Sequence, residues 1–208
     1  SGAKWIRVLY MYPDGATPEL IQLMKERDNL VKYFDMPLQH INNNVLKRMN
    51  RRMTRAQIEE ALTRIRQEIP EATIRTQFIV GFPGETEEEF AELLAFVKEQ
   101  EFDRVGCFAF SQEESTKTGQ MPDQVDEATK QKRVERLMKV QREISRRKHK
   151  AFVGKVVPVL VEGVSEETDL LLEGRHSQQA PEIDGVTYIS SGEAKVGDLV
   201  QVIITDSH

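Results

Sequence analysis

The segment Gly81-Phe-Pro-Gly84-Glu-Thr is a glycine-rich turn between an apolar run and an acidic one, where a ligand could bind. A Walker phosphate loop requires Gly-x-x-x-x-Gly-Lys-Ser/Thr and a dinucleotide fingerprint requires Gly-x-Gly-x-x-Gly, and this turn fits neither pattern. Thr86 and Glu89 predict a capping box, and we expect Glu85 and Glu87 to Glu89 to complement the positive end of the following helix. The turn therefore indicates either a plain strand-to-helix connection or a site for a ligand other than a phosphate.

Polar side chains recur with a period of two on two apolar runs near this turn. A parallel strand that is covered on both faces is apolar throughout, so polar residues on it indicate a cavity, and sites of α/β proteins are built near the carboxyl ends of such strands. The alternative is that the glutamines cap loops and the arginine pairs with an acid outside the strand. The residues that share a face are Asp35, Pro37 and Gln39 on one run and Arg75, Gln77 and Ile79 on the next.

Cysteine and histidine, the usual metal ligands, are few in this chain. Cys107 is the only cysteine, which excludes an internal disulfide and a cysteine-rich metal site, and we expect it to be a small buried strand residue. The four histidines are scattered, and none forms a pair at metal-ligand spacing: His40, His149, His176 and His208. The sequence predicts no metal site.

The elements that must position these residues follow from the apolar pattern. Runs over residues 5–12, 31–38, 73–80 and 105–110 are rich in β-branched and aromatic residues and predict strands. Between them, a helix begins at the capping box Thr54-Arg-Ala-Gln57 and ends before Pro70, and Phe90 begins another helical repeat after the turn. This alternation predicts an α/β fold with a parallel sheet and right-handed crossovers.

The carboxyl-terminal third has a different pattern. A long basic helix is predicted over residues 126–150. The basic face of such a helix is usually only solvated, and contact with nucleic acid is the alternative. Four short apolar runs separated by Gly, Ser and Asp then follow, as is typical of a small antiparallel barrel. We divide the chain into a first domain over residues 1–142 and an all-β domain over residues 143–208.

Length and composition limit the class of protein. The chain has 208 residues, of which 39% are hydrophobic and 30% charged, enough for one medium domain and a small one. It has no apolar run of about 18 residues and no signal peptide, which excludes membrane and secretory classes and makes a cytoplasmic location the expectation. It lacks an initiator methionine, and we interpret Ser1 and Gly2 as a cloning remnant and the chain as a fragment cut inside a fold.

Several motifs occur together in one order. "PLQH" is followed by "VLKRMNR", "IRTQFIVGFPGET", "FAFSQEEST", the basic helix and a small barrel with "EGRHSQQAPEIDG". Together they resemble the radical S-adenosylmethionine methylthiotransferases over nearly the whole chain. The resemblance implies the carboxyl-terminal part of a radical SAM partial (β/α) barrel with parallel strands, followed by a small all-β barrel similar to a TRAM domain. "PLQH", "SQEEST" and "APEIDG" favour the ribosomal-protein-modifying RimO type over the tRNA-modifying MiaB type.

The resemblance also implies a role for the turn. In radical SAM enzymes the turn after the fifth strand lies against the adenine of S-adenosylmethionine, where a flat apolar edge and backbone groups suit a neutral base. Gln39 and Arg51 are implied to reach the ribose and methionine part, with Arg52 as a competitor for Arg51, and Gln77 to lie near the ribose. The implied adenine contacts are Gly81, Phe82, Pro83 and Gly84, and no catalytic residue is assigned.

One departure from the family is large. The Cys-x-x-x-Cys-x-x-Cys loop that holds the iron-sulfur cluster is absent, as is the amino-terminal domain that carries a second cluster. The resemblance implies that the intact enzyme uses S-adenosylmethionine and two 4Fe-4S clusters to add a methylthio group to the β-carbon of an aspartate in a small-subunit ribosomal protein. We expect this chain alone to be inactive.

The net charge of the carboxyl-terminal module indicates the kind of partner that it binds. From residue 151 onward the chain has ten acidic and three basic residues, a net charge of −7, whereas an RNA-binding barrel would carry excess lysine and arginine. An acidic barrel would attract a basic ribosomal protein, although acidic turns can also serve solubility alone. A tRNA adenosine methylthiotransferase stays open as an alternative and predicts salt-sensitive tRNA binding through Arg142, Arg146, Arg147 and Lys148.

Two further expectations concern this chain as a binding protein. An inert partner-binding fragment is the second alternative, which predicts affinity for a partner and none for S-adenosylmethionine. Residues 5–12 would form an exposed edge strand, so we also expect self-association.

Overall fold

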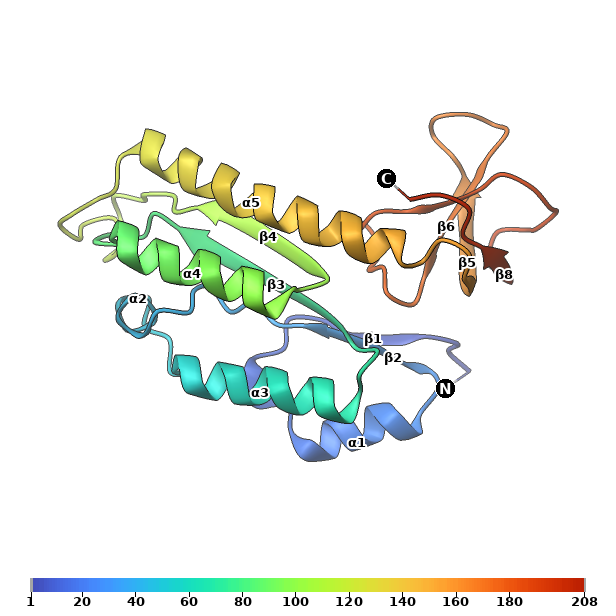
Figure 1. Ribbon diagram of the computed structural model, residues 1–208, viewed down its shortest axis with the longest axis horizontal. Helices are drawn as coiled ribbons and strands as arrows, with labels where there is room; N and C mark the ends of the chain where they lie inside the picture. Colours follow the sequence, from blue (N-terminus) through green and yellow to red (C-terminus); the bar gives the residue numbers. More distant parts are fainter. Residues whose placement is uncertain (1, 208) are drawn as a thin grey trace.

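Four parallel strands in the order β1-β2-β3-β4 form the first sheet of the computed structural model, which describes residues 2–207 (Figure 1). The expected α/β arrangement is confirmed, with Asp35, Arg75 and Arg104 side by side on neighbouring strands. Ser1 of the expected cloning remnant and His208 lie outside the described residues. The strands are β1 (Ile6–Val8), β2 (Leu30–Asp35), β3 (Thr73–Val80) and β4 (Arg104–Ala109).

β1 and β2 are shorter than the apolar runs that predicted them. β1 has three residues, and Tyr10 with a φ of 55° leaves the extended conformation soon after it. β2 stops before Pro37, which has no amide hydrogen for the ladder. The Leu38 amide instead donates to Thr76 Oγ1, and an isolated bridge from Gln39 to Phe78 resumes the pairing.

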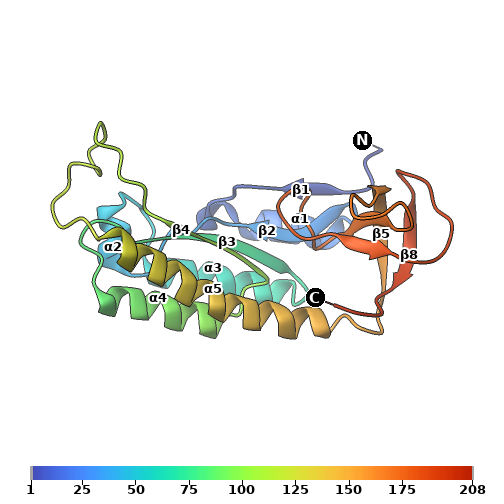
Figure 2. The same cartoon turned by 90° about the horizontal axis from the view of Figure 1, so that it is seen from above.

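Helices cover one face of this sheet. Figure 2 shows α3, α4 and α5 on one side of the strands, where Phe34, Phe78 and Phe96 form part of a fully buried core. The capping boxes of Thr54 with Gln57 and of Thr86 with Glu89 are both confirmed. The helices are η1 (Pro13–Gly15), α1 (Pro18–Glu26), α2 (Asn43–Arg48), α3 (Arg55–Glu68), α4 (Glu87–Gln100) and α5 (Glu127–Lys150).

α1 and α2 were not among the predicted helices, although their start signals are present. Thr17 caps α1 ahead of a proline at its first position, and Asn42 caps α2 through two backbone amides. None of the helices within residues 2–207 is long and apolar enough to cross a membrane.

The second sheet is antiparallel, in the order β7-β6-β5-β8, and curls into half of a barrel. Val159, Val161 and Ile189 form its small core. Helix α5 leads into it without a break, so the predicted boundary between residues 142 and 143 falls inside that helix and stays a prediction. The strands are β5 (Val156–Val164), β6 (Leu172–His176), β7 (Thr187–Ile189) and β8 (Leu199–Ile203).

The segment between β6 and β7 attaches the second sheet to the first. Ala180 is buried against Val31 and Tyr33, and the Arg7 guanidinium donates to the carbonyl oxygen of Gln179 at 2.8 Å. Because side chains alternate along a strand, Tyr33 lies on the opposite face of β2 from the core residue Phe34. This segment therefore covers part of the face of the first sheet that the helices leave free.

Candidate functional site

The turn after β3 is held in a conformation that requires glycine at both ends. Gly81 and Gly84 have φ values of 71° and 72°, and a Cβ at Gly81 would collide with the side chain of Lys130. Phe82 is 4% exposed and packs edge to face on Phe110, with ring centroids 5.0 Å apart. The turn is thus covered by α5 and by the segment after β4, and only Gly84 of the four predicted contacts is half-buried.

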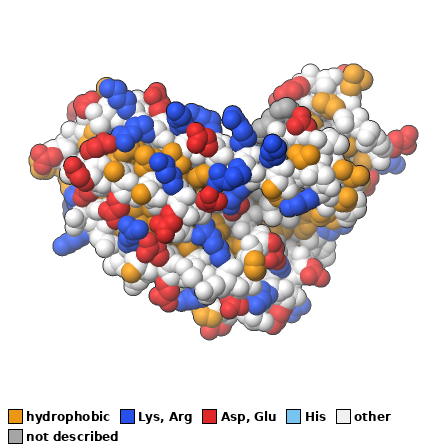
Figure 3. Space-filling model, viewed as in Figure 1, with side chains coloured by type: hydrophobic (Ala, Val, Ile, Leu, Met, Phe, Trp, Pro, Cys, Tyr) orange, Lys and Arg blue, Asp and Glu red, His pale blue; other side chains and the backbone are white. Residues whose placement is uncertain are grey.

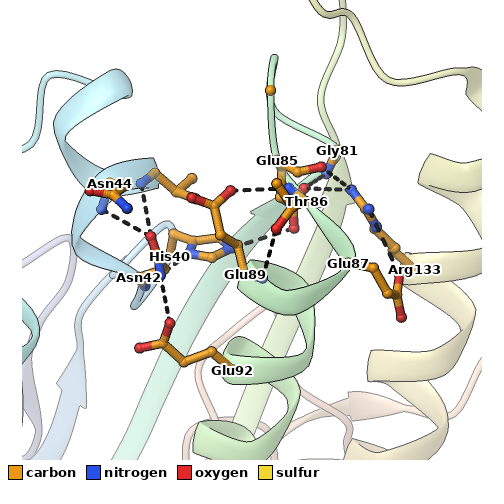
Figure 4. A network of polar contacts seen from close by, with 12 residues as sticks. His40, Asn42, Asn44, Gly81, Glu85, Thr86, Glu87, Glu89, Glu92 and Arg133 are labelled. Atoms are coloured by element: carbon orange, nitrogen blue, oxygen red, sulfur yellow. Dashed lines mark hydrogen bonds and ion pairs between the residues drawn. The ribbon is translucent and has the colours of Figure 1, made fainter.

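Glu85 organises the turn from inside. Its carboxylate has no exposed surface, accepts a hydrogen bond from the Gly81 amide, and lies 3.3 Å from Arg133 Nη1 (Figure 4). The same guanidinium donates to the Glu85 carbonyl oxygen at 3.1 Å. The carboxylate turns inward to the backbone of its own turn, and the expectation that Glu85 also complements the amino terminus of α4 stays a prediction.

His40 connects the turn to the end of β2. Its ring has no exposed surface, and Nε2 lies 3.5 Å from Glu85 Oε1 (Figure 4). Nδ1 accepts a hydrogen bond of 3.0 Å from the Asn42 amide, so it carries no proton. His40, which follows Gln39, is thus held against Glu85, which follows Gly84.

Arg48 holds the outer side of the turn. One of its nitrogens donates to the Gly84 carbonyl oxygen at 3.2 Å and to Glu89 Oε2 at 2.6 Å. Burial would raise the pKa of the Glu89 carboxyl, but the hydrogen bonds from Arg48 and from the Thr86 amide outweigh that effect and hold the pKa below its usual range.

The structure brings Gln39 and Gln77 together through their backbones. The Gln39 amide donates to the Gln77 carbonyl oxygen at 2.8 Å, and the Ile79 amide donates to the Gln39 carbonyl oxygen at 2.8 Å. Gln39 has a φ of 70°, an uncommon conformation for a residue other than glycine. Both side chains are half-buried, which leaves them partly open to a ligand.

Arg75 and Asp35 form a buried ion pair below Gln77 on the same face. Nη1 of Arg75 donates to Asp35 Oδ1 at 2.6 Å. With its amide oxygen turned toward the guanidinium, Gln77 accepts from both Nη1 and Nη2 of Arg75 at 2.8 Å. Asp35, Arg75 and Gln77 are therefore joined in one hydrogen-bonded network. The acid that pairs with Arg75 is Asp35, on the neighbouring strand β2.

Within residues 2–207, Arg51 makes no hydrogen bond to the other predicted residues. It is exposed after α2, as is Arg52, and its amide bonds to Leu46 within that segment. The arginine of this segment that contacts the turn is Arg48, one helical turn earlier.

Cys107 lies in β4 and packs partly buried against the core. Burial and the nearby charge of Glu85 raise the pKa of its thiol to about 12, so it is a protonated thiol near neutral pH. Within residues 2–207, no three His, Cys, Asp or Glu side chains are grouped so that they could hold a metal ion.

Sequence reasoning missed His40, Arg48, Glu85 and Arg133 as site residues. Two of them adjoin predicted ones in the sequence, since His40 follows Gln39 and Glu85 follows Gly84. No local pattern marks Arg133, which reaches the turn from α5 across 48 residues. The half-buried amides of Gln39 and Gln77 can hydrogen-bond to a polar ligand, on a backbone frame that buried charges hold in place.

Comparisons with known proteins agree with this architecture. The sequence profile of the Radical SAM superfamily matches residues 2–97, and that of the TRAM domain matches residues 153–208. Coproporphyrinogen III oxidase (HemN) from Escherichia coli, a radical SAM enzyme, has a similar structure with a TM-score of 0.56 at 19% identity, covering 67% of this chain and 32% of that chain. At that identity the likeness shows the fold alone. The protein therefore has a radical SAM domain followed by a TRAM domain.

Relatives with the name "Ribosomal protein uS12 methylthiotransferase RimO" match along the whole chain. The protein from Bdellovibrio bacteriovorus is 63% identical over 206 residues, 99% of this chain and 45% of the relative. The protein from Syntrophotalea carbinolica is 54% identical over 207 residues, 100% of this chain and 46% of the relative. The chain belongs to the RimO-type family of radical SAM proteins, and it spans about half the length of these curated relatives.

Proposed function

We propose that the whole protein adds a methylthio group to the β-carbon of an aspartate in ribosomal protein uS12 by a radical S-adenosylmethionine mechanism. The observation that carries the proposal is the identity of 63% and 54% with two RimO proteins over at least 99% of this chain. The order of polar strand ends, buried turn and TRAM domain along this chain supports it.

S-adenosylmethionine fits the face of the sheet that carries Gln39 and Gln77. Amides that are half-buried and fixed by the neighbouring backbone can both donate to and accept from ribose hydroxyls and the methionine part. The backbone of residues 81–84 would bound the adenine, with Glu85 and Arg133 keeping the turn in place. When bound with its cluster, the cofactor supplies the radical chemistry, while these residues bind and orient it.

An iron-sulfur cluster does not fit this chain by itself. Such clusters require several cysteine thiolates, and Cys107 is a single, partly buried thiol whose pKa is raised to about 12. The two 4Fe-4S clusters of the proposed reaction therefore need ligands from outside these 208 residues. We propose that the chain alone is inactive and that it contributes part of the cofactor wall and the TRAM domain.

Several cations of the basic helix α5 are already paired with acidic side chains, which leaves fewer of them for tRNA phosphates. Of the four side chains named for tRNA binding, Lys148 lies 2.7 Å from Asp103, and Arg147 pairs with Glu101. Arg133 and Arg136 are paired with Glu85 and Glu87 in the same way. This pairing supports the ribosomal-protein substrate over the tRNA alternative.

The TRAM domain is proposed as the docking surface for uS12. Its net charge of −7 over residues 151–208 would attract a basic protein and accelerate encounter with it. Modification of a ribosomal protein also implies a cytoplasmic location.

The test uses the full-length protein with both clusters reconstituted, S-adenosylmethionine, a sulfur source and purified uS12. The expected result is one methylthio group on one aspartate of uS12, located by tandem mass spectrometry. The matched control replaces uS12 with tRNA under the same conditions. Modification of tRNA without modification of uS12 would contradict the proposal.

A further inference from the structure

A cavity of about 700 Å³ lies along β4 from Arg104 to Phe108 and beside Arg75 near the start of β3. The carboxyl-terminal half of α5 and the TRAM loop over residues 182–185 form its other walls. Its volume is in the range of about 300–1,000 Å³ that is usual for small-molecule sites. None of the residues assigned above to S-adenosylmethionine lines it.

Two cations on the wall of this cavity remain available for a ligand. Arg75 is bound to Asp35 and Arg104 lies 3.7 Å from Asp184, so those charges are partly neutralised. Arg142 and Arg146 lie one turn apart on α5, are exposed, and pair with no acidic side chain among residues 2–207. Figure 3 shows lysine and arginine side chains gathered over this half of α5, beside the second sheet.

A buried acceptor without a partner also lines the cavity. Gln141 is 3% exposed, and its Nε2 donates to the Phe102 carbonyl oxygen and to Ser145 Oγ, both at 3.0 Å. Its Oε1 has no hydrogen-bond partner among the described residues. A buried acceptor normally has a donor, so a ligand hydroxyl or amino group at this point would satisfy it.

The remaining wall is apolar and partly aromatic. Phe108 is 54% exposed on β4, and Met138 and Ile183 flank the same cavity. An exposed aromatic ring beside free arginines is a suitable surface for a planar base, which can stack on it. Glu182, on the TRAM loop, can accept hydrogen bonds from ribose hydroxyls.

We propose that this cavity binds a nucleoside phosphate. Arg142 and Arg146 hold the phosphate groups, because a guanidinium binds phosphate through two parallel hydrogen bonds. The base lies against Phe108, and Gln141 Oε1 accepts from the ligand. The observations that carry this site are separate from those that support the methylthiotransferase function.

The test is isothermal titration of the 208-residue chain with ADP, with adenosine, with inorganic phosphate and with a short single-stranded RNA. ADP is expected to bind, and adenosine and inorganic phosphate are each expected to bind at least about tenfold more weakly, because each lacks one set of contacts. The double variant R142Q/R146Q is expected to weaken ADP binding by about tenfold to a hundredfold. Phe108→Ala tests the base contact separately, with a loss for ADP and none for inorganic phosphate.

The matched control is the double variant R147Q/K148Q, which removes the same charge from the same end of α5 but outside the cavity lining. This control variant is expected to bind ADP with an affinity within about twofold of that of the unmodified chain, since screened surface charges contribute little at physiological salt. No ADP binding at millimolar concentration, or an equal loss in both double variants, would overturn the proposal. Tighter binding of the RNA than of ADP, lost in R142Q/R146Q alone, would also overturn the proposal, because these arginines would then form an RNA-binding surface rather than a nucleoside phosphate site.

Discussion

The Tyr33 hydroxyl donates a hydrogen bond of 2.6 Å to the carboxylate of Asp184, which joins the centre of the radical SAM sheet to a loop of the TRAM domain. Arg7 stacks over the Tyr33 ring at 4.2 Å and bonds the same TRAM segment. Burial and the contact with Asp184 raise the pKa of the Tyr33 hydroxyl, which keeps it protonated as the donor. The two domains are thus fixed by a few specific polar contacts.

Removal of this hydrogen bond should loosen the domain contact without changing either core. We expect Tyr33→Phe to lower the free energy of unfolding by about 1–3 kcal/mol, because Asp184 loses a donor in a mostly buried position. Urea unfolding measures the change. Tyr188→Phe is the matched control, since the Tyr188 hydroxyl meets Glu167 at the surface, and it should change stability by less than about 0.5 kcal/mol. Equal effects of the two substitutions would contradict this reading of the contact.

The carboxylate of Glu85 should be the most sensitive polar group of the turn. Glu85→Ala leaves the Gly81 amide without its acceptor and the buried Arg133 with only the exposed Glu87, at 3.8 Å, as an acidic partner among the described residues, and we expect a loss of about 3–5 kcal/mol in unfolding free energy. Glu87→Ala removes an exposed carboxylate two residues away and should cost less than about 1 kcal/mol. Thermal and urea unfolding of both variants give the comparison, and a loss below 1 kcal/mol for Glu85→Ala would refute the buried-anchor role.

Stability should fall in mild acid because of His176. Burial, together with the charges of Arg104, His149 and Arg7, lowers the pKa of His176 to about 4, against 6.5 in the unfolded chain. Between these values the unfolded chain binds the extra proton, so stability is intact above about pH 6.5 and declines toward pH 4 by up to about 1.4 kcal/mol per pH unit. His176→Phe keeps the stacking on Phe152 and should reduce that slope in urea titrations across the range. A slope unchanged by the substitution would assign the acid sensitivity to other groups.

The free edge of β1 should promote self-association of this chain. Among the described strands β1 pairs with β2 alone, and Ile6 is 37% exposed on it. Light scattering at rising concentration should show a growing mass, which Ile6→Lys should suppress. Leu170→Lys is the control, because Leu170 is 87% exposed in a loop rather than on an edge strand. A monomer at all concentrations would contradict the expectation.

The sequence predicted the parallel sheet, the capped helices and the change to an all-β module because each depends on local periodicity and caps. β3 matched its predicted range, whereas β1 was overestimated because Tyr10 adopts a positive φ that an apolar run does not encode. The turn over residues 81–84 was recognised as unusual, but its burial under Lys130 and Phe110 depends on packing between distant segments.

The buried charges of the site also depend on contacts between distant segments, which the sequence alone does not predict. Glu85 reads as one of four glutamates at a helix start, and only the tertiary position of Arg133 makes it an interior anchor. The cavity beside Arg142 and Arg146 likewise exists only because α5, β4 and the TRAM loop meet. Contacts of this kind have no local signal in a single sequence.

The most direct test of the account is a titration of this chain with purified uS12 and, separately, with bulk tRNA over a range of salt concentrations. The account predicts binding to uS12 that weakens as salt rises, because an acidic TRAM domain of net charge −7 meets a basic protein, and little binding to tRNA. Binding to tRNA without binding to uS12 would contradict the account and make α5, rather than the TRAM domain, the docking surface.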